Sequence, residues 1–384
     1  MFKGVQRKRV AIDVGAVLCS GPKTRMTGIY RTTLEFIKAL ASAESPGFDI
    51  LLFGQRLRRP TLRSLNLGFP SRQIRLPRWD SIERVKTWFP LVEAMCNHDL
   101  FHATANFAFL KCPERALATI HDAMFFSHPE TELGHEREAE LIGPFARRCR
   151  GIITCSEASK TDILTFLEVD PARVHVLPWG VRHDVFHPED DDESLRTFLK
   201  ARFGLRRPYF LQVSCSSGRK NSRLVFEQYR RLFRSKPNND MVFVWHAPPP
   251  DVLTLCEREG LQDHVHFVSC LTDEELRLLY CGATAHLFPS AYEGFGLPVL
   301  EAMACGTPSV TSCSSSLPEV GGDAALYVNL ADPDELFKIM ERFENHRYDR
   351  AELRAKGLER AQQFRWDGYV RGVLKLYEYY LTDI

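Results

Sequence analysis

The chain has 384 residues, of which 44% are hydrophobic and 26% are charged. These proportions are those of a soluble globular protein and exclude a disordered or collagen-like chain. Fifty Lys and Arg residues nearly balance 49 Asp and Glu residues, so the chain lacks the basic excess of a protein that wraps nucleic acid. The length favours two domains.

The cysteines give no sign of a disulfide framework or a zinc ribbon. The chain holds 11 Cys, an odd number, and none are spaced as C-x-x-C, so a reducing compartment is expected. The apolar run Val10–Cys19 resembles a leader only superficially, because Asp13 interrupts it and Leu18 precedes Cys19. No run approaches the ~20 apolar residues of a membrane span. We expect a cytoplasmic protein.

Short apolar runs alternate with amphipathic stretches along the first half of the chain. A helix is predicted over Ile29–Leu40, where apolar side chains recur at helical spacing. Strand, helix and strand in repeated order predict a parallel sheet with crossover helices. The predicted strands are Val10–Val14, Asp49–Phe53, Leu100–His102, Ala116–Ile120, Gly151–Cys155 and Val174–Leu177.

The alternation lapses between about 178 and 208. The acidic run there, Asp190–Glu193, comes just before an amphipathic stretch. Acidic residues are favoured in the first turn of a helix, so the run predicts a helix start rather than a metal cluster.

Alternation resumes from Tyr209. The predicted strands are Tyr209–Ser214, Met241–His246, Val265–Val268, Ala285–Pro289, Ser309–Thr311 and Ala325–Val328. The predicted helices are Ser222–Arg234, Asp251–Glu259, Asp273–Cys281, Pro298–Cys305, Pro333–Glu344, Arg350–Phe364 and Trp366–Leu381.

The predicted fold class is α/β, with two Rossmann-like doubly wound domains that face each other across a ligand-binding cleft. The N-terminal domain is expected over 1–190, a linker over 191–207 and the C-terminal domain over 208–365. A last helix over 366–384 is expected to pack back on the N-terminal domain.

A strand, a glycine loop and a helix meet in the segment Glu293-Gly-Phe-Gly-Leu-Pro-Val-Leu-Glu301. Two glycines allow a close approach of the backbone to a ligand, and Pro298 fits the first turn of a helix. Free amides at a helix N-terminus bind anions. The candidate diphosphate cradle therefore comprises Gly294, Phe295, Gly296 and Leu297.

The two carboxylates of this segment occupy different places. Glu293 precedes the loop, whereas Glu301 lies one turn into the helix. A carboxylate accepts hydrogen bonds from a vicinal hydroxyl pair, which suits the 2′ and 3′ hydroxyls of a ribose. The alternative is that Glu301 only balances the helix dipole and the glycines only form a turn.

This segment resembles the E-x7-E signature of the retaining glycosyltransferases of family four, which have the GT-B fold. The resemblance covers nearly the whole chain, through seven further motifs in the family's order. They are Gly28–Arg31, Ile120–Asp122, His128–Glu130, Ile153–Ser159, Val176–Val181, Gly218–Asn221 and Ser315–Val320. The resemblance implies a first domain that binds the acceptor and a second that binds a nucleotide sugar.

The resemblance also implies roles for residues of the second domain. Glu293 would bond hydroxyls of the donor sugar and Glu301 would hold the ribose. Arg219 and Lys220 would neutralise charge on the departing diphosphate. Many members carry a further Arg where this chain has Ser214–Ser217, so phosphate binding is expected to rest on Arg219 and Lys220. Without the resemblance, these two read as solvated charges on a turn.

In the first domain, the resemblance implies that His121 contacts the donor sugar near the reacting carbon. Gly28 would let the backbone meet the diphosphate, although Tyr30 replaces a small residue common in that turn. The alternative for His121 is a structural histidine. Catalytic roles thus fall to His121, Lys220 and Glu293.

The expected activity is transfer of a sugar from a nucleotide diphosphate to a hydroxyl of a glycan or lipid-linked saccharide, with retention at the anomeric carbon. GDP-mannose is the first choice of donor, by resemblance to the GDP-mannose-type members, and surface polysaccharide synthesis is the expected setting. A UDP-sugar is the alternative donor. No cofactor or metal is expected, because GT-B enzymes use basic side chains and amides instead.

Three other classes fit less well. A dinucleotide-dependent oxidoreductase would need a third glycine and an acidic residue ending the next strand. A phosphorylase-like enzyme would need a pyridoxal-bearing Lys that the sequence does not point to. A non-catalytic nucleotide-sugar-binding module would not need His121, Lys220, Glu293 and Glu301 together.

A basic segment suggests contact with a membrane. Residues 56–86 carry nine Arg or Lys and two acids, with aromatic residues interleaved or adjacent up to Phe89. Such a segment docks on an anionic leaflet at about 1 kcal/mol per basic residue. A solvated arginine-rich loop is the equal alternative, and the sequence leaves the oligomeric state open.

Overall fold

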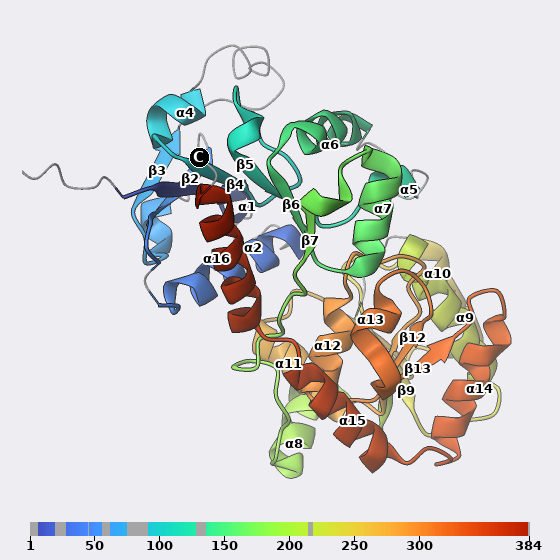
Figure 1. Ribbon diagram of the computed structural model, residues 1–384. Helices are drawn as coiled ribbons and strands as arrows, with labels where there is room; N and C mark the ends of the chain where they lie inside the picture. The colour runs from blue at the N-terminus through green and yellow to red at the C-terminus, as the bar shows by residue number, and fades with distance from the viewer. Residues whose placement is uncertain are drawn as a thin grey trace, which may run out of the picture. The chain divides into compact units, whose positions relative to one another are not determined.

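The computed structural model describes residues 7–19, 28–44, 46–55, 62–74, 91–127, 136–213 and 218–382 (Figure 1). The chain divides into two units. The first comprises residues up to Gly180 together with those from Trp366 onward, and the second runs from Val181 to Arg365. The last segment of the chain therefore belongs to the unit in which the chain begins.

The first unit is built on a parallel sheet with the strand order β3-β2-β1-β4-β5-β6-β7. Residues of β4, β5 and β6 are buried throughout, as in a parallel sheet covered on both faces. The strands are β1 (Arg9–Asp13), β2 (Asp49–Gln55), β3 (Ser71–Ile74), β4 (Leu100–Ala103), β5 (Ala116–Thr119), β6 (Gly151–Thr154) and β7 (Val174–Val176).

Helices cover both faces of this sheet. They are α1 (Gly15–Cys19), α2 (Gly28–Ala41), α4 (Leu91–Cys96), α5 (Met124–Ser127), α6 (Glu136–Arg148), α7 (Glu157–Leu167) and α16 (Trp366–Thr382). Phe101 of β4 shares a buried apolar cluster with α6 and α7. The next residue, His102, points to the opposite face, as strand geometry requires, and its Nδ1 lies 2.5 Å from the hydroxyl of Tyr377 in α16. Figure 1 shows α16 alongside α2.

The second unit has a parallel sheet with the order β10-β9-β8-β11-β12-β13. The order reverses at β8, where a doubly wound sheet opens a crevice at the carboxyl ends of its strands. The strands are β8 (Tyr209–Val213), β9 (Asp240–Val244), β10 (Val265–Val268), β11 (Ala285–Phe288), β12 (Ser309–Ser312) and β13 (Ala325–Val328).

The two faces of β11 have different neighbours. Ala285 and Leu287 join an apolar cluster with α9 and α14, whereas His286 and Phe288 face the other way. The helices of this unit are α8 (Asp192–Phe203), α9 (Ser222–Phe233), α10 (Pro250–Glu259), α11 (Asp273–Gly282), α12 (Leu297–Ala304), α13 (Leu317–Gly321), α14 (Pro333–Glu344) and α15 (Arg350–Gln362).

Strand β3 and helix α8 differ from the sequence expectations. Strand β3 was not predicted, because Ser71-Arg-Gln-Ile at the sheet edge has no apolar alternation. The segment 191–207, expected as a linker, holds helix α8, which buries Leu195 and Leu199. Asp191 caps this helix by accepting hydrogen bonds from the amides of Glu193 and Ser194, so the acidic run is a helix start, as predicted.

Candidate active site

The basic turn Gly218–Lys220 is attached to the carboxyl end of the neighbouring strand β11. The amide of Ala291 donates to the Arg219 carbonyl over 2.7 Å, and the Asn221 side-chain amide donates to the Pro289 carbonyl over 2.8 Å. The Ser290 hydroxyl also donates to the Arg219 carbonyl, over 3.2 Å. One backbone and two side-chain hydrogen bonds therefore hold this turn beside the residues that follow β11.

Glu293 lies between the two basic side chains of this turn. The Lys220 ammonium donates a hydrogen bond to Glu293 Oε1, and Arg219 Nη1 lies 3.3 Å from the same oxygen. The side chains of Lys220 and Glu293 are only 12% and 10% exposed. Lys220 Nζ also lies 4.7 Å from the centre of the Phe288 ring. The cluster thus holds two cations and one carboxylate largely out of water.

The protonation state of Glu293 follows from this arrangement. Burial by itself would raise the pKa of Glu293, but the positive charges of Lys220 and Arg219 and the hydrogen bonds from Lys220 and Ser290 lower it below its ordinary value of 4.5. Glu293 is therefore a carboxylate at neutral pH. A charged, buried carboxylate can accept hydrogen bonds from hydroxyl groups of a bound sugar.

Serine side chains fix the backbone of the loop after Glu293. The hydroxyls of Ser315 and Ser316 donate to the Glu293 carbonyl over 2.6 and 2.8 Å, and Ser316 also lies 2.7 Å from the Phe295 carbonyl. The Phe295 ring is buried against Phe364, so its part in an anion site can only come from its backbone. The motif at 315–320 resembles one of the family, but the sequence did not predict that its serines contact the loop after Glu293.

Gly296 is required at the start of α12. Its φ of +114° lies where side chains are strained, and a Cβ here would come within 2.9 Å of Leu317 Cδ2. Leu297 is the first residue of α12. The predicted cradle over residues 294–297 is thus a tight loop into a helix N-terminus, the geometry that presents backbone amides to an anion.

Glu301 is the fifth residue of α12, one turn after the helix begins, and is buried. The Tyr280 hydroxyl donates to Glu301 Oε2 over 3.3 Å. Tyr280 comes from α11, and nothing in the local sequence pointed to it, because its contact with Glu301 arises only when α11 and α12 pack together.

His121 follows β5 in the first unit. Its backbone amide donates to the Asn106 side chain over 3.0 Å, and its Nε2 lies 2.9 Å from the Thr104 carbonyl. The Trp179 ring is 5.4 Å away. Burial lowers the pKa of His121 to about 4, so the imidazole is neutral at pH 7. Its Nδ1 has no hydrogen-bond partner among the described residues.

Gly28 begins α2, and a Cβ there would meet no described atom within 4 Å. The described residues therefore give no steric reason for a glycine at this position. Gly28 and His121 belong to the first unit, whereas Arg219, Lys220, Glu293 and Glu301 belong to the second. The structure brings Arg219, Lys220 and Glu293 into contact. The meeting of residues from the two units in one cleft stays a prediction.

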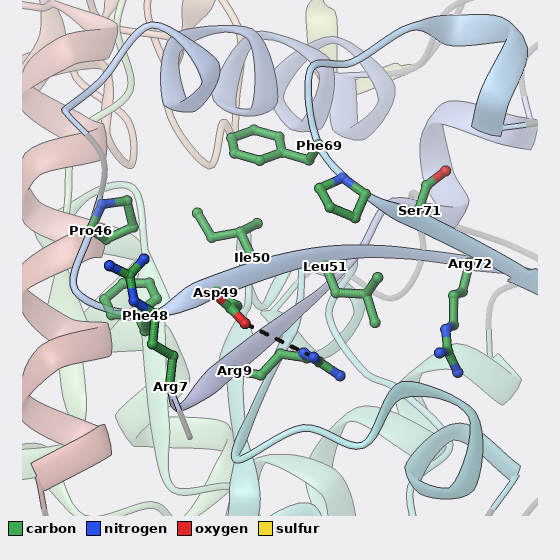
Figure 2. A pocket seen from close by; sticks show the side chains of 11 residues that line it. Arg7, Arg9, Pro46, Phe48, Asp49, Ile50, Leu51, Phe69, Ser71 and Arg72 are labelled. Carbon is green, nitrogen blue, oxygen red and sulfur yellow. Dashed lines mark ion pairs between the residues drawn. The ribbon is translucent and has the colours of Figure 1, made fainter. Parts of the chain in front are cut away.

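A hollow of about 510 Å³ lies in the first unit, and none of the predicted site residues lines it (Figure 2). Arg9, Asp49 and Ser71, the first residues of β1, β2 and β3, line it, so it lies at the amino ends of these strands. Asp49 is 3.9 Å from Arg9. His121, by contrast, follows β5 and so lies beyond the carboxyl ends of the strands of this parallel sheet.

Other predicted features lie wholly or partly outside the described residues. These are His128–Glu130, Ser214–Ser217 and most of the basic segment 56–89. Within the described ranges, no group of three or more His, Cys, Asp and Glu side chains is placed to hold a metal ion. A search of the same residues found no helix with the length and apolar character of a membrane span.

Comparison with known proteins identifies the class to which this fold and site belong. Residues 26–185 match the family "Glycosyltransferase Family 4", and residues 196–363 match "Glycosyl transferases group 1". Sucrose-phosphate synthase from Thermosynechococcus elongatus has the same fold, with a TM-score of 0.76 over 98% of this chain and 100% of that one, at 19% identity. WaaG, a glycosyltransferase involved in lipopolysaccharide biosynthesis, gives 0.72 over 96% and 99% at 15% identity. The chain is a glycosyltransferase of family four with the GT-B fold.

Its relatives include named mannosyltransferases. The chain is 28% identical over 382 residues to O-antigen chain mannosyltransferase B of Escherichia coli, covering 93% of this chain and 97% of that protein. It is 32% identical over 245 residues to the MMP alpha-(1->4)-mannosyltransferase of Mycolicibacterium hassiacum, covering 62% and 56%. The predicted family, fold class and enzyme class are thereby confirmed.

Proposed function

We propose that this glycosyltransferase moves a mannosyl group from GDP-mannose to a hydroxyl of a saccharide acceptor, with retention, in the assembly of a surface polysaccharide. The observation that carries this is the buried cluster of Lys220, Arg219 and Glu293, with Glu301 eight residues further on. Two relatives are named as mannosyltransferases, which supports the choice of sugar. The O-antigen chain mannosyltransferase B, which is matched over nearly its full length, also supports the setting.

The cluster is suited to a departing diphosphate. Two cations face one carboxylate, so the cluster carries a net positive charge that a diphosphate would balance. Lys220 and Arg219 stabilise negative charge as it develops on the leaving group, and backbone amides before α12 add to this effect. Glu293 orients hydroxyls of the donor sugar and Glu301 holds the ribose.

Retention is proposed to occur by attack from the same face as the leaving group. The acceptor oxygen forms the new bond to the anomeric carbon, the bond from that carbon to the phosphate oxygen breaks, and the acceptor proton passes to the departing phosphate. Glu293 is a poor nucleophile for the alternative route because two cations engage its carboxylate and lower its pKa. His121, neutral and buried, is proposed to contact the sugar from the first unit.

The acceptor is proposed to be a glycan or a lipid-linked saccharide, with peripheral membrane contact through residues 56–89. The charge of that segment supports this contact. Co-sedimentation of the full chain with anionic and neutral vesicles at physiological salt tests it. We expect binding to the anionic vesicles only, and no binding to either would favour a water-soluble acceptor.

A donor screen tests the function directly. Purified protein is incubated with GDP-mannose, other GDP-sugars and UDP-sugars, with and without saccharide acceptors, and nucleotide release is measured with Glu293→Gln as the control. We expect GDP release from GDP-mannose and an α-linked product by NMR. Turnover of a UDP-sugar would change the donor, an inverted product would remove retention, and binding without turnover would indicate a non-catalytic module.

A further inference from the structure

A line of contacting side chains joins the two acidic residues of the site. The centres of the Tyr280 and His286 rings lie 5.4 Å apart, with an angle of 87° between the ring planes. His286 stacks on Phe288, with ring centres 5.5 Å apart and an angle of 24° between the planes. At one end of this line Tyr280 bonds Glu301, and at the other Phe288 lies under Lys220. The aromatic pair on β11 therefore supports both ends of the site.

Tyr280 itself is held firmly. Its side chain is fully buried, and a second ring, that of Phe186, packs against it edge-on at 6.2 Å. The Thr307 hydroxyl donates to the Tyr280 carbonyl over 2.6 Å, which ties the end of α11 to the loop after α12. Ring contacts on two sides and an anchored backbone hold the Tyr280 side chain in place, and its hydroxyl donates to Glu301.

We propose that Tyr280 is the positioning residue that orients the Glu301 carboxylate for the ribose of a nucleotide donor; this rests on the proposed function. A buried carboxylate needs a hydrogen-bond donor to stay charged and oriented. Tyr280 donates to Oε2, which favours one orientation of the carboxylate. A ribose hydroxyl pair then meets acceptor atoms that are already in place, and binding costs less ordering.

The chain offers a matched control in Tyr209. This tyrosine is also fully buried in the second unit, and its hydroxyl donates to the Leu279 carbonyl over 2.7 Å, one residue before Tyr280. Tyr209→Phe therefore removes a similar buried hydrogen bond from the same part of the unit without touching Glu301. A purely structural effect should be common to both variants.

The test is a thermodynamic cycle between Tyr280→Phe and a ribose hydroxyl. Binding of GDP, UDP and ADP, and of their 2′-deoxy forms, is measured by calorimetry for the wild type, Tyr280→Phe and Tyr209→Phe. We expect the wild type and Tyr209→Phe to bind each 2′-deoxynucleotide roughly tenfold more weakly than the ribonucleotide. This penalty is the size of one hydrogen bond from the ribose 2′-hydroxyl to a charged group. In Tyr280→Phe the ribonucleotide should bind about tenfold more weakly, and the 2′-deoxy penalty should shrink to less than about threefold.

The outcomes separate this inference from the proposed function. Wild-type protein that binds none of the three nucleotides would overturn both. Nucleotide binding with the same 2′-deoxy penalty in Tyr280→Phe as in the wild type would overturn the positioning role alone. In turnover, Tyr280→Phe should raise the KM for the donor and leave kcat within about twofold; an equal loss of kcat in both tyrosine variants would also contradict it.

Discussion

Lys220 and Glu293 form an ion pair that joins residues 73 positions apart, and both side chains are largely buried. We expect Lys220→Ala to lower kcat about 100-fold to 1,000-fold, as the loss of one group that stabilises developing charge does. Stability should fall by about 1–3 kcal/mol, because a buried carboxylate loses a partner while Arg219 remains. Steady-state kinetics and urea unfolding measure the two effects.

Lys338 is the control for that variant. Its ammonium lies 4.0 Å from Asp332 on the exposed surface, and such pairs contribute little. Lys338→Ala should leave both kcat and stability close to wild type. Equal losses in the two variants would show that the burial of the Lys220 pair has no special effect.

Glu293 should make stability depend on pH in the acidic range. Its pKa in the folded chain lies below the ordinary 4.5, so the unfolded chain binds more protons as the pH falls below about 4.5. The stabilisation from ionised Glu293 is present above that pH and is lost as the pH falls through the folded-state pKa. The Tm difference between wild type and Glu293→Gln should therefore shrink from pH 5 to pH 3. A constant difference would contradict the lowered pKa.

His121 should make stability depend on pH in a higher range than Glu293 does. Its pKa is lowered by burial from 6.5 to about 4, so between these values the unfolded chain is protonated and the folded chain is not. Stability should fall as the pH drops from 6.5 to 4, by up to about 1.4 kcal/mol per pH unit from this residue. The free energy of unfolding, measured with urea at pH 7, 6 and 5, should depend less on pH in His121→Gln than in the wild type. An equal pH dependence in the two proteins would contradict the lowered pKa of His121.

Gly296 should tolerate no side chain. Gly296→Ala places a Cβ at a φ of +114° and against Leu317, at a cost of roughly 1–3 kcal/mol, and it should also weaken nucleotide binding by distorting the loop before α12. Thermal unfolding and calorimetry measure both. Gly357→Ala is the matched control, because Gly357 lies inside α15 and a Cβ there meets Met303 of α12 only at ordinary contact distances of 3.5 Å or more. It should be neutral or stabilising.

Activity should not require a divalent metal. Lys220 and Arg219 already provide two positive charges at the proposed diphosphate site, which is the role a metal would otherwise fill. We expect full turnover in excess EDTA. Loss of activity in EDTA with recovery on addition of Mn²⁺ or Mg²⁺ would overturn this prediction.

The fold class could be predicted from the sequence because the patterns that indicate strands and helices are local. β10 and α14 begin and end at the predicted residues, and Asp332 caps α14 by accepting a hydrogen bond from the Asp334 amide. Polar β3 carried no such signal and became a strand only by pairing with β2 at the sheet edge. Helix α8 was expected only as a helix start, and its full length depended on burial of Leu195 and Leu199 in the second unit.

The candidate site divides in the same way. The sequence by itself supplied Glu293 and Glu301 through the spacing of one motif, and it supplied Arg219 and Lys220 through the resemblance to the family. The tertiary structure decided that both cations meet one buried carboxylate, that Ser315 and Ser316 fix its backbone, and that Tyr280 bonds Glu301. These contacts join residues 21 to 74 positions apart. Such contacts form only when strands and helices pack, so no local pattern along the chain encodes them.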